Sequence, residues 1–452
     1  MSLDGFLSPS SVVVVGGSPI EGKFGYQIVK NITSLGFRGR LYVVNLKGED
    51  VLGVPAAPRV DMLEEVPELG VVVLPPDAAV DAFLELADAN VRNVIMASSG
   101  FSEAGGEGVE RERVVLEEAR RKRIRVFGPS TVGLVNFSAR FAPMLTPVRK
   151  FEAGEVSFVG HSGGLTCGLG WWQPEGVKFS KLIHVGNACD VNEEDVLKFL
   201  SMDRETKVIL CQFCKLTGRV VRGVEEAASV KPVVAYCVSD EAEKLRDAGA
   251  ICVSHYNEMF DAARILLSRV PRGNRVAVIG PSSGAISIAT SRLEENGLTL
   301  ACLSEKTERV IREKVLSPFS PSVNPVDYWP PTKLNGEEVG EKHRVAVNAL
   351  VGDERVDIVF LILELMEEIA FDVEKAFREA ADKDKTLVAV LVQVEDNISK
   401  EVRKGMRKLN IPYFWDAERA VRVVGEVAKW AQRRYQSIQT GVMTSDATNT
   451  FN

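Results

Sequence analysis

With 452 residues, of which 45% are hydrophobic and 26% charged, the chain has the length of two to three domains and the composition of a globular protein with a substantial core. Its net charge of −7 disfavours general binding to nucleic acid or to anionic membranes. No apolar run approaches the roughly 20 residues of a membrane span, and the N-terminus lacks a signal-peptide pattern. We therefore expect a cytoplasmic protein without nucleic-acid or membrane partners.

The first part of the chain alternates apolar runs with helical patterns. The runs expected to be strands are Ser11–Val15, Leu41–Val44, Gly70–Leu74, Asn93–Ala97 and Ile124–Phe127. Helical patterns between them include Gly25–Leu35, Ala78–Ala89 and Gly108–Arg121. This alternation predicts a parallel sheet with helices on both faces. We expect a doubly wound domain over residues 1–142.

Further α/β units follow after a linker around Pro147. The second unit is expected over 143–272, with strands at Val156–Val159, Lys181–His184, Val208–Phe213, Pro232–Tyr236 and Ala250–Val253. The third is expected over 273–436, with strands at Val276–Ile279, Leu298–Cys302, Asp357–Leu363 and Leu387–Val392. The end of the chain, 437–452, is rich in Thr, Ser and Asn and is expected to be a disordered tail.

Each expected domain opens with a strand, a turn of small residues and a helix. The turns are Gly16-Gly17-Ser18-Pro19, Gly160-His161-Ser162-Gly163-Gly164 and Gly280-Pro281-Ser282-Ser283-Gly284. Glycine lets the backbone approach a ligand closely, and a helix N-terminus offers N–H groups and positive dipole to an anion. One such turn is compatible with any βα unit, but a set of them indicates a protein that handles phosphates.

The first turn also suggests a NAD-dependent oxidoreductase, and the sequence disfavours that class. Gly16, Gly17, Gly22 and Gly25 do not have the GxGxxG spacing. The second expected strand ends at Asn45, where an Asp or Glu would bind the ribose. A nucleotide-like ligand remains compatible with this turn.

An ordered series of motifs carries a more specific resemblance. In the first domain these are Val13–Ser18, Val43-Val44-Asn45, Val72–Pro75, Ser99–Glu103 and Gly128–Gly133; in the second, Ser162–Leu165, Phe179–Leu182, Val185-Gly186-Asn187 and Asp190-Val191; in the third, Val276–Gly284 and Asn324–Asp327. From about Leu7 to Trp430 the chain resembles the alpha subunit of the ADP-forming acetyl-CoA and acyl-CoA synthetases, relatives of succinyl-CoA synthetase.

The resemblance implies a CoA-binding Rossmann-like domain followed by two flavodoxin-like domains with parallel sheets, as in succinyl-CoA synthetase. The residues it implies for CoA binding are Gly17, Ser18, Gly25, Asn45, Lys47, Pro75, Ser99, Gly100 and Phe101. The residues it implies for phosphate binding, at two helix starts, are Ser162, Gly163, Gly164, Ser282, Ser283 and Gly284. A hetero- or homo-oligomer is implied as well. A separate beta-type ATP-grasp subunit would bind the nucleotide and Mg²⁺, because we find no such domain here and no metal site.

The chain departs from the family at the histidine that carries the phosphoryl group. The family places it in a Ser-His-Thr-Gly-like motif after the strand equivalent to Pro232–Tyr236, and here Cys237–Asp240 leads directly into a helix. His255 echoes the motif one strand too late. The partner carboxylate is replaced by Cys214. Together these differences predict that the usual phosphohistidine relay is absent.

His161, at the start of the second turn, is the remaining candidate for phosphate chemistry. It stands where relatives have Gln or Arg, so it is expected to act as a hydrogen-bond donor to phosphate, with a nucleophilic role as the alternative. The other expectations are plain: Cys211 and Cys214 as two core cysteines, and His343 as solvated surface between charged neighbours.

These observations leave three hypotheses. The first is an alpha-type subunit of an NDP-forming acyl-CoA synthetase, an acid–thiol ligase that converts acyl-CoA, NDP and phosphate to acid, NTP and CoA. The second is a non-catalytic paralogue that senses CoA or serves assembly. The third, a distant one, is a Rossmann oxidoreductase.

Overall fold

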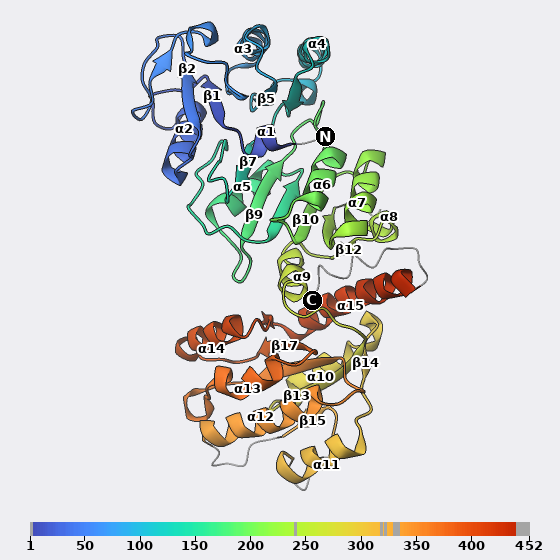
Figure 1. Cartoon of the computed structure of the whole chain (residues 1–452). Coiled ribbons are helices and arrows are strands. Elements are labelled where there is room, and N and C mark those ends of the chain that lie inside the picture. Colours follow the sequence, from blue (N-terminus) through green and yellow to red (C-terminus); the bar gives the residue numbers. More distant parts are fainter. Residues whose placement is uncertain (1–2, 239–241, 317–319, 321–322, 329–334, 440–452) are drawn as a thin grey trace. The chain divides into compact units, whose positions relative to one another are not determined.

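The computed structural model describes residues 3–238, 242–316, 320, 323–328 and 335–439 (Figure 1). It divides into two compact units, Met1–Cys252 and Val253–Asn452. Within these described ranges, the first unit contains two β-sheets and the second unit contains one. In the described ranges, every helix is too short or too polar to cross a membrane.

The first sheet is parallel and has the strand order β3-β2-β1-β4-β5-β6. Its strands are β1 (Ser11–Val15), β2 (Arg40–Val44), β3 (Ala56–Ala57), β4 (Leu69–Val72), β5 (Asn93–Met96) and β6 (Arg125–Phe127). Its helices are α1 (Asp4–Leu7), α2 (Phe24–Leu35), α3 (Pro76–Asp88) and α4 (Glu107–Lys122), with short 3-10 turns at Val60–Met62 and Ser102–Ala104.

Alternation along β1 sends neighbouring side chains to opposite faces of this sheet. Val12 and Val14 pack in the same core cluster as residues of α1 and α2, whereas Val13 and Val15 pack with residues of α3 and α4. Both faces are therefore covered by helices. The expected doubly wound arrangement is present.

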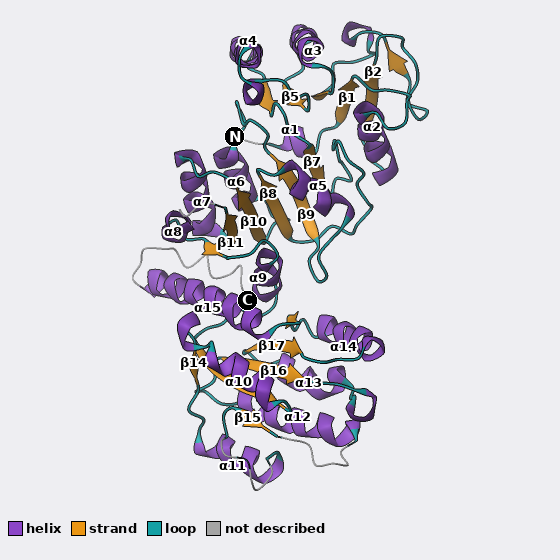
Figure 2. Ribbon diagram, turned by 180° about the vertical axis from the view of Figure 1, so that it is seen from behind, coloured by secondary structure: helices purple, strands orange, loops and turns teal. Residues whose placement is uncertain are grey.

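The second sheet has the order β12-β11-β10-β8-β9-β7. Its strands are β7 (Gly133–Asn136), β8 (Val156–Gly160), β9 (Phe179–His184), β10 (Val208–Phe213), β11 (Val233–Cys237) and β12 (Ile251–Cys252), with helices α5 (Gly163–Trp171), α6 (Glu193–Met202), α7 (Gly218–Val230) and α8 (Ala242–Asp247). The central strands β8, β9 and β10 lie side by side in Figure 2. All pairs are parallel except β7 with β9, which are antiparallel. The strand β7 is absent from the sequence-based prediction.

The sheet of the second unit is parallel, in the order β14-β13-β16-β17-β18, and β15 also pairs with β13. Its strands are β13 (Arg275–Gly280), β14 (Thr299–Leu300), β15 (Val326–Asp327), β16 (Ile358–Leu363), β17 (Thr386–Leu391) and β18 (Tyr413–Phe414). Its helices are α9 (Glu258–Leu266), α10 (Ser283–Ser291), α11 (Glu305–Lys314), α12 (Gly336–Val351), α13 (Val373–Ala381), α14 (Asp396–Lys408) and α15 (Ala417–Gln439), with 3-10 turns at Glu294–Asn296 and Glu367–Ile369.

Candidate functional site

The three glycine turns follow the strands at which the order of each sheet reverses. Strand β1 lies between β2 and β4, strand β8 between β9 and β10, and strand β13 between β14 and β16. In open α/β sheets, ligands bind outside the carboxyl ends of the strands at such a reversal. Each sheet thus has one topologically favoured position for a ligand, and a glycine turn occupies each of them.

The first turn has a backbone that only glycine permits. Gly16 has a φ of +94°, and a Cβ at this position would lie 2.4 Å from the carbonyl oxygen of Val73. A Cβ on Gly25 would lie 2.0 Å from the carbonyl oxygen of Gly16, so helix α2 and the turn touch backbone to backbone. Lys23 occupies the N-cap position of α2, and no side chain caps this helix start with a hydrogen bond. Its first N–H groups are thus available to an anionic ligand.

The other residues expected at the CoA site follow β2, β4 and β5, which end at the same edge of the sheet. The Asn45 side chain bonds both backbone groups of Glu49, so it closes its own loop. Lys47 is exposed and lies 3.6 Å from the carboxylate of Glu49. Pro75 directly precedes α3. These positions frame the first turn, but only Lys47 among them offers a cationic group.

The segment Ser99–Phe101 is tied down by the chain itself. The backbone N–H groups of Gly100 and Phe101 donate to Glu103 Oε1 at 2.6 and 3.3 Å. The Phe101 side chain is fully buried, and the Ser99 and Ser130 hydroxyls lie 3.3 Å apart. Although burial alone would raise the pKa of Glu103, hydrogen bonds from Asn187 and Gly100 hold it below its usual value. A carboxylate thus already occupies these two amides.

At the second turn, side chains of the protein itself also accept backbone N–H groups. The N–H of Ser162 donates to Gln212 Oε1 at 2.9 Å, and the Ser162 hydroxyl accepts from the N–H of Leu165 at 3.4 Å. Gln212 is buried on β10, next to β8. The start of α5 therefore has fewer N–H groups left for a ligand than the start of α2.

His161 is held at both ring nitrogens. Its Nε2 lies 2.9 Å from Glu193 Oε1, and its Nδ1 accepts the backbone N–H of Cys214 at 3.3 Å. In this arrangement Nδ1 is the acceptor, and Nε2 is the nitrogen that faces the carboxylate. Burial would raise the pKa of Glu193, but the His161 hydrogen bond holds it below its usual value. The structure brings His161, Glu193 and Cys214 together, and Glu193 was not predicted as part of this site.

His184 contacts the backbone of His161 and so helps to fix its position. Its Nδ1 accepts the N–H of Val132 at 3.1 Å, and its Nε2 lies 3.2 Å from the carbonyl oxygen of His161. Burial lowers the pKa of His184 to about 4, so the ring is neutral near pH 7. The sequence offered no motif around His184, because its partners come from two other parts of the chain.

The third turn resembles the first in its open helix start. Helix α10 begins after Ser282 without a side-chain cap. A Cβ on Gly280 would lie 2.6 Å from Ile362 Cβ, so the turn packs closely against β16. Asp327 pairs with Gly280, and its buried Oδ1 has no hydrogen-bond partner within the described part of the chain. The sequence-predicted Ser282, Ser283 and Gly284 thus lie at an uncapped helix N-terminus beside a carboxylate.

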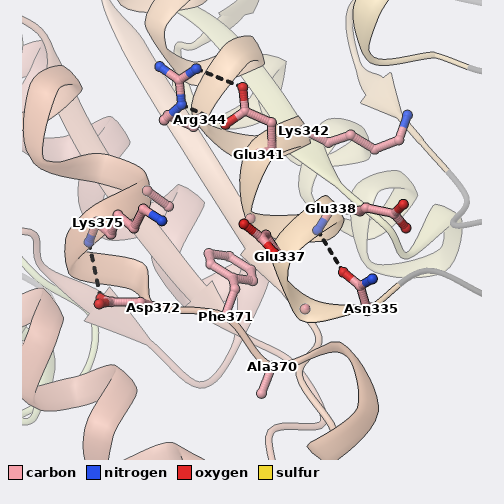
Figure 3. Close-up of a pocket in the computed structure, with 13 residues that line it drawn as sticks. Asn335, Glu337, Glu338, Glu341, Lys342, Arg344, Ala370, Phe371, Asp372 and Lys375 are labelled. Atoms are coloured by element: carbon pink, nitrogen blue, oxygen red, sulfur yellow. Dashed lines mark hydrogen bonds and ion pairs between the residues drawn. The ribbon is translucent and has the colours of Figure 1, made fainter.

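A pocket of about 870 Å³ lies between the starts of α12 and α13 (Figure 3). Phe371 points between the two helix starts, and both helices are capped, by Asn335 and Asp372 respectively. The lining carries charges of both signs, including a Glu341–Arg344 ion pair at 2.6 Å. No residue of the third glycine turn lines this pocket. We assign no ligand to it.

Three further expectations have structural outcomes. Cys211 is buried as expected, but Cys214 is exposed because it lies just beyond the end of β10, so the prediction of two core cysteines is wrong for Cys214. His343 is buried, not solvated, because it lies on the inner face of α12 against Tyr328. His255 lies in the turn before α9 in the second unit, where its backbone N–H donates to the carboxylate of Glu258, the first residue of that helix.

The segment that should carry the family's histidine runs from β11 to α8. Ser239, Asp240 and Glu241 lie outside the described residues. On either side of them, β11 ends at Cys237 and α8 begins at Ala242. The described part of this connection contains no histidine.

Two family models match the first unit. Residues 10–136 match a CoA-binding domain, and residues 153–244 match a succinyl-CoA ligase-like flavodoxin domain. These matches and the sheet topologies define a class: a CoA-binding Rossmann-like domain followed by a succinyl-CoA ligase-like flavodoxin domain.

Within that class, the chain is a homologue of the alpha-type subunits of ADP-forming acyl-CoA synthetases. It is 28% identical to the alpha subunit of ADP-forming acetate–CoA ligase I of Pyrococcus furiosus, over 96% of this chain and 98% of that subunit. It is 29% identical to ADP-forming acetate–CoA ligases II and I of Archaeoglobus fulgidus, over 95% and 94% of this chain, and spans about two thirds of their length (67% and 63%).

Solved structures have the same fold. A Pyrococcus horikoshii OT3 protein with 25% identity aligns over 95% of this chain and 99% of its own, with a TM-score of 0.83. A dinucleotide-forming acetyl-coenzyme A synthetase 1 of Ca. Korarchaeum cryptofilum, with phosphate and ADP, aligns over 98% of this chain and 99% of its own, with a TM-score of 0.85 at 22% identity.

Proposed function

We propose that this chain is the CoA- and acyl-CoA-binding alpha-type part of an NDP-forming acyl-CoA synthetase, located in the cytoplasm. The observation that carries the proposal is the first turn, where a backbone contact closed by glycine meets an uncapped helix start inside the matched CoA-binding region. CoA carries phosphates. A helix start with free N–H groups stabilises a bound anion of this kind by roughly 0.3–1 kcal/mol per charge.

Gly17, Ser18 and Gly25 would approach the ligand with the backbone, and Lys47 would meet a phosphate. The rim of the site would be shaped by Asn45, Pro75 and the Ser99–Phe101 segment. The Asn45 side chain and the backbone N–H groups of Gly100 and Phe101 already form hydrogen bonds within the chain, and Pro75 has no backbone N–H to donate. The proposed domains remain 1–142 for CoA and 143–272 and 273–436 for the two ligase-like parts, with 437–452 as a tail.

The phosphoryl-transfer half is proposed to be altered. Helices α2 and α10, which follow the first and third turns, start without side-chain caps. At the second turn, by contrast, the Gln212 side chain and the Ser162 hydroxyl already accept backbone N–H groups of the chain. His161 has no ring nitrogen free of a hydrogen bond. A phosphoryl group on His161 would require one of these bonds to break. His161 therefore fits the role of an orienting donor better than that of a nucleophile.

A beta-type ATP-grasp subunit would supply the nucleotide and Mg²⁺ in this proposal. The names of the Pyrococcus furiosus relatives, which are alpha subunits, support a separate partner. Phosphate would contact Ser282, Ser283 and Gly284 at the open start of α10.

Calorimetric titration of the full chain with CoA and with NADH tests the binding half. We expect CoA to bind and NADH not to bind, and NADH binding without CoA binding would refute the proposal. Incubation with labelled ATP and an ATP-grasp partner tests the catalytic half. We expect no acid-labile phosphate on His161 or His255, and a label lost in either alanine variant would show that the relay survives.

A second candidate is a non-catalytic paralogue that senses CoA or serves assembly. The substitution of Cys214 for the expected carboxylate and the internal bonding of His161 favour it. It predicts CoA binding without acyl-CoA-dependent NTP formation, even when an ATP-grasp partner is present.

A further inference from the structure

The loop after β9 brings a residue of the second sheet to the ligand edge of the first sheet. The backbone N–H of Asn187 donates to the carbonyl oxygen of Pro129 at 2.8 Å, just after the end of β6. Gly186, with a φ of +66°, permits this approach, because a Cβ there would lie 2.2 Å from the same oxygen. Asn187 therefore lies at the carboxyl end of β6, on the edge that carries the proposed CoA site.

Two carboxylates set the orientation of the Asn187 side-chain amide. Its Nδ2 lies 2.6 Å from Glu103 Oε2, 2.9 Å from Glu112 Oε2 and 3.1 Å from Ser102 Oγ. Ionised carboxylates accept hydrogen bonds and donate none, so the NH₂ group must be the end that faces the two glutamates. The other end of the amide is then the carbonyl oxygen, Oδ1.

The carbonyl oxygen of the Asn187 side chain is an unused acceptor. Among the residues that the structure describes, none donates a hydrogen bond to it. Asn187 is half-buried and its Oδ1 is not enclosed, so a ligand can reach this oxygen. An amide fixed in this way can accept from a ligand N–H or O–H through Oδ1, but its NH₂ group is no longer available as a donor.

The charges along this edge change from one end to the other. Lys23 and Lys47 are exposed near the first turn and after β2. Glu103 and Glu112 lie at the other end, beside Asn187. An anion is therefore favoured at the first turn and disfavoured next to Asn187. A ligand that fits the whole edge has its phosphates at one end and a neutral hydrogen-bond donor at the other.

The spacing of the strands matches one donor group of CoA. Strands β5 and β6 lie two and three strands from β1, or about 10 Å and about 14 Å away. The pantetheine arm of CoA has two amide N–H groups, roughly six and ten bonds from the nearest phosphorus, which is about 7 Å and about 12 Å in an extended chain. The farther one, the cysteamine amide, is the group that reaches the end of β5 and β6.

We propose that Asn187 Oδ1 accepts a hydrogen bond from the cysteamine amide N–H of CoA and acyl-CoA, an inference that rests on the proposed binding of CoA at the first turn. Asn187 is then a binding residue that the second sheet contributes to the site. The contact also positions the sulfur, which follows this amide after a short two-carbon link. The loop of Asn187 starts from β9, which ends at His184, and His184 Nε2 lies 3.2 Å from the carbonyl oxygen of His161. The reacting end of CoA is thereby directed towards the second turn.

The test is a set of calorimetric titrations of the full chain with CoA and with a CoA analogue in which CH₂ replaces the cysteamine N–H. The unchanged chain should bind the analogue about tenfold more weakly than CoA, the scale of an acceptor left without its donor. Asn187→Ala should bind CoA about tenfold more weakly than the unchanged chain does, and should bind CoA and the analogue equally. If the analogue still loses tenfold in the variant, the two changes are independent and Asn187 is not the partner of this N–H.

Two controls separate the contact from a structural effect of the substitution. The ligand 3′-phospho-ADP has the phosphates of CoA but no pantetheine arm, so it should bind Asn187→Ala and the unchanged chain alike; a tenfold loss for this ligand would refute the contact. Glu112→Gln keeps an oxygen for the Asn187 NH₂ group and should retain the preference for CoA over the analogue. A lost preference in Glu112→Gln would assign the effect to the charge of the rim and would also refute the contact.

The unchanged chain separates this proposal from the proposed function without any variant. If it binds CoA and the analogue equally, the Asn187 contact is refuted while CoA binding stands. If it does not bind CoA, the proposed function falls and the contact falls with it. Circular dichroism of each variant verifies that it is folded.

Discussion

Lowering the pH from about 7 to about 5 is expected to destabilise the unit Val253–Asn452, because that unit buries a neutral imidazole. His343 is 1% exposed, and one of its ring nitrogens lies 2.8 Å from the Tyr328 hydroxyl. Its ring also lies against Phe371, with centroids 4.9 Å apart. Burial lowers the pKa of His343 from 6.5 to about 4. A proton thus binds the unfolded chain more readily than the folded chain.

The sign and size follow from proton linkage. The folded pKa is depressed, so the stability contributed by neutral His343 is fully present above pH 6.5 and is lost as the pH falls from 6.5 towards 4. With these two values, the free energy of unfolding should decrease by about 2 kcal/mol between pH 7 and pH 5. Burial would raise the pKa values of Asp353 and Asp357, but hydrogen bonds hold them below the usual 3.8. The stability that these two carboxylates contribute is therefore lost only at a lower pH than the stability contributed by His343.

This loss is measured within the full chain by urea unfolding, with hydrogen exchange of α12 peptides as the readout. The exchange is corrected for the pH dependence of the intrinsic exchange rates. The matched variant is His343→Leu combined with Tyr328→Phe, which removes both polar partners and leaves neither buried alone. It should lose at least half of the pH-dependent change. If the double variant is destabilised by acid as much as the unchanged chain, His343 is not the cause and the reasoning is refuted.

Three other predictions concern the first unit. Gly25→Ala should weaken CoA binding at least about tenfold by calorimetry, because its Cβ would lie 2.0 Å from the Gly16 carbonyl oxygen; unchanged affinity would remove the close backbone approach from the argument. Lys181→Met should lower the free energy of unfolding by about 3 kcal/mol in urea, because Lys181 is 2% exposed and lies 2.6 Å from Asp203, and a loss below about 1 kcal/mol would contradict this. Gly168→Ala, in α5 with no atom within 4 Å of the new Cβ, should stabilise by up to about 1 kcal/mol, and destabilisation in the same titration would show hidden crowding.

The sequence predicted the sheets and their turns because those signals are local. The apolar run Ser11–Val15 becomes β1 with the expected bounds, and Gly16 after it takes the positive φ that the turn requires. The strand β7 could not be recognised in this way. Its four residues pair with β9, which lies more than 40 positions further along the chain, and no local pattern encodes that pairing.

In the candidate site, too, local features were predictable from the sequence and contacts between distant parts of the chain were not. The second turn was recognised from Gly160–Gly164, but the pairing of His161 with Glu193 depends on where β8 and α6 meet. The error at His343 was avoidable, because Val339, His343 and Val347 recur at helical spacing and predict an inward face. Its charged neighbours in sequence point elsewhere on the helix.

The antiparallel strand β7 has a consequence for any attempt to isolate the second sheet. The match to the flavodoxin-like domain begins at residue 153, and the second expected domain begins at residue 143, both after β7 has ended at Asn136. A fragment cut at either point would expose the backbone of β9 along the side where β7 now lies. Unpaired edges of this kind recruit strands from other molecules, so such a fragment would be prone to self-association. In the intact chain, β7, at the end of the region that matches the CoA-binding domain, covers this edge of the second sheet and so protects it against aggregation.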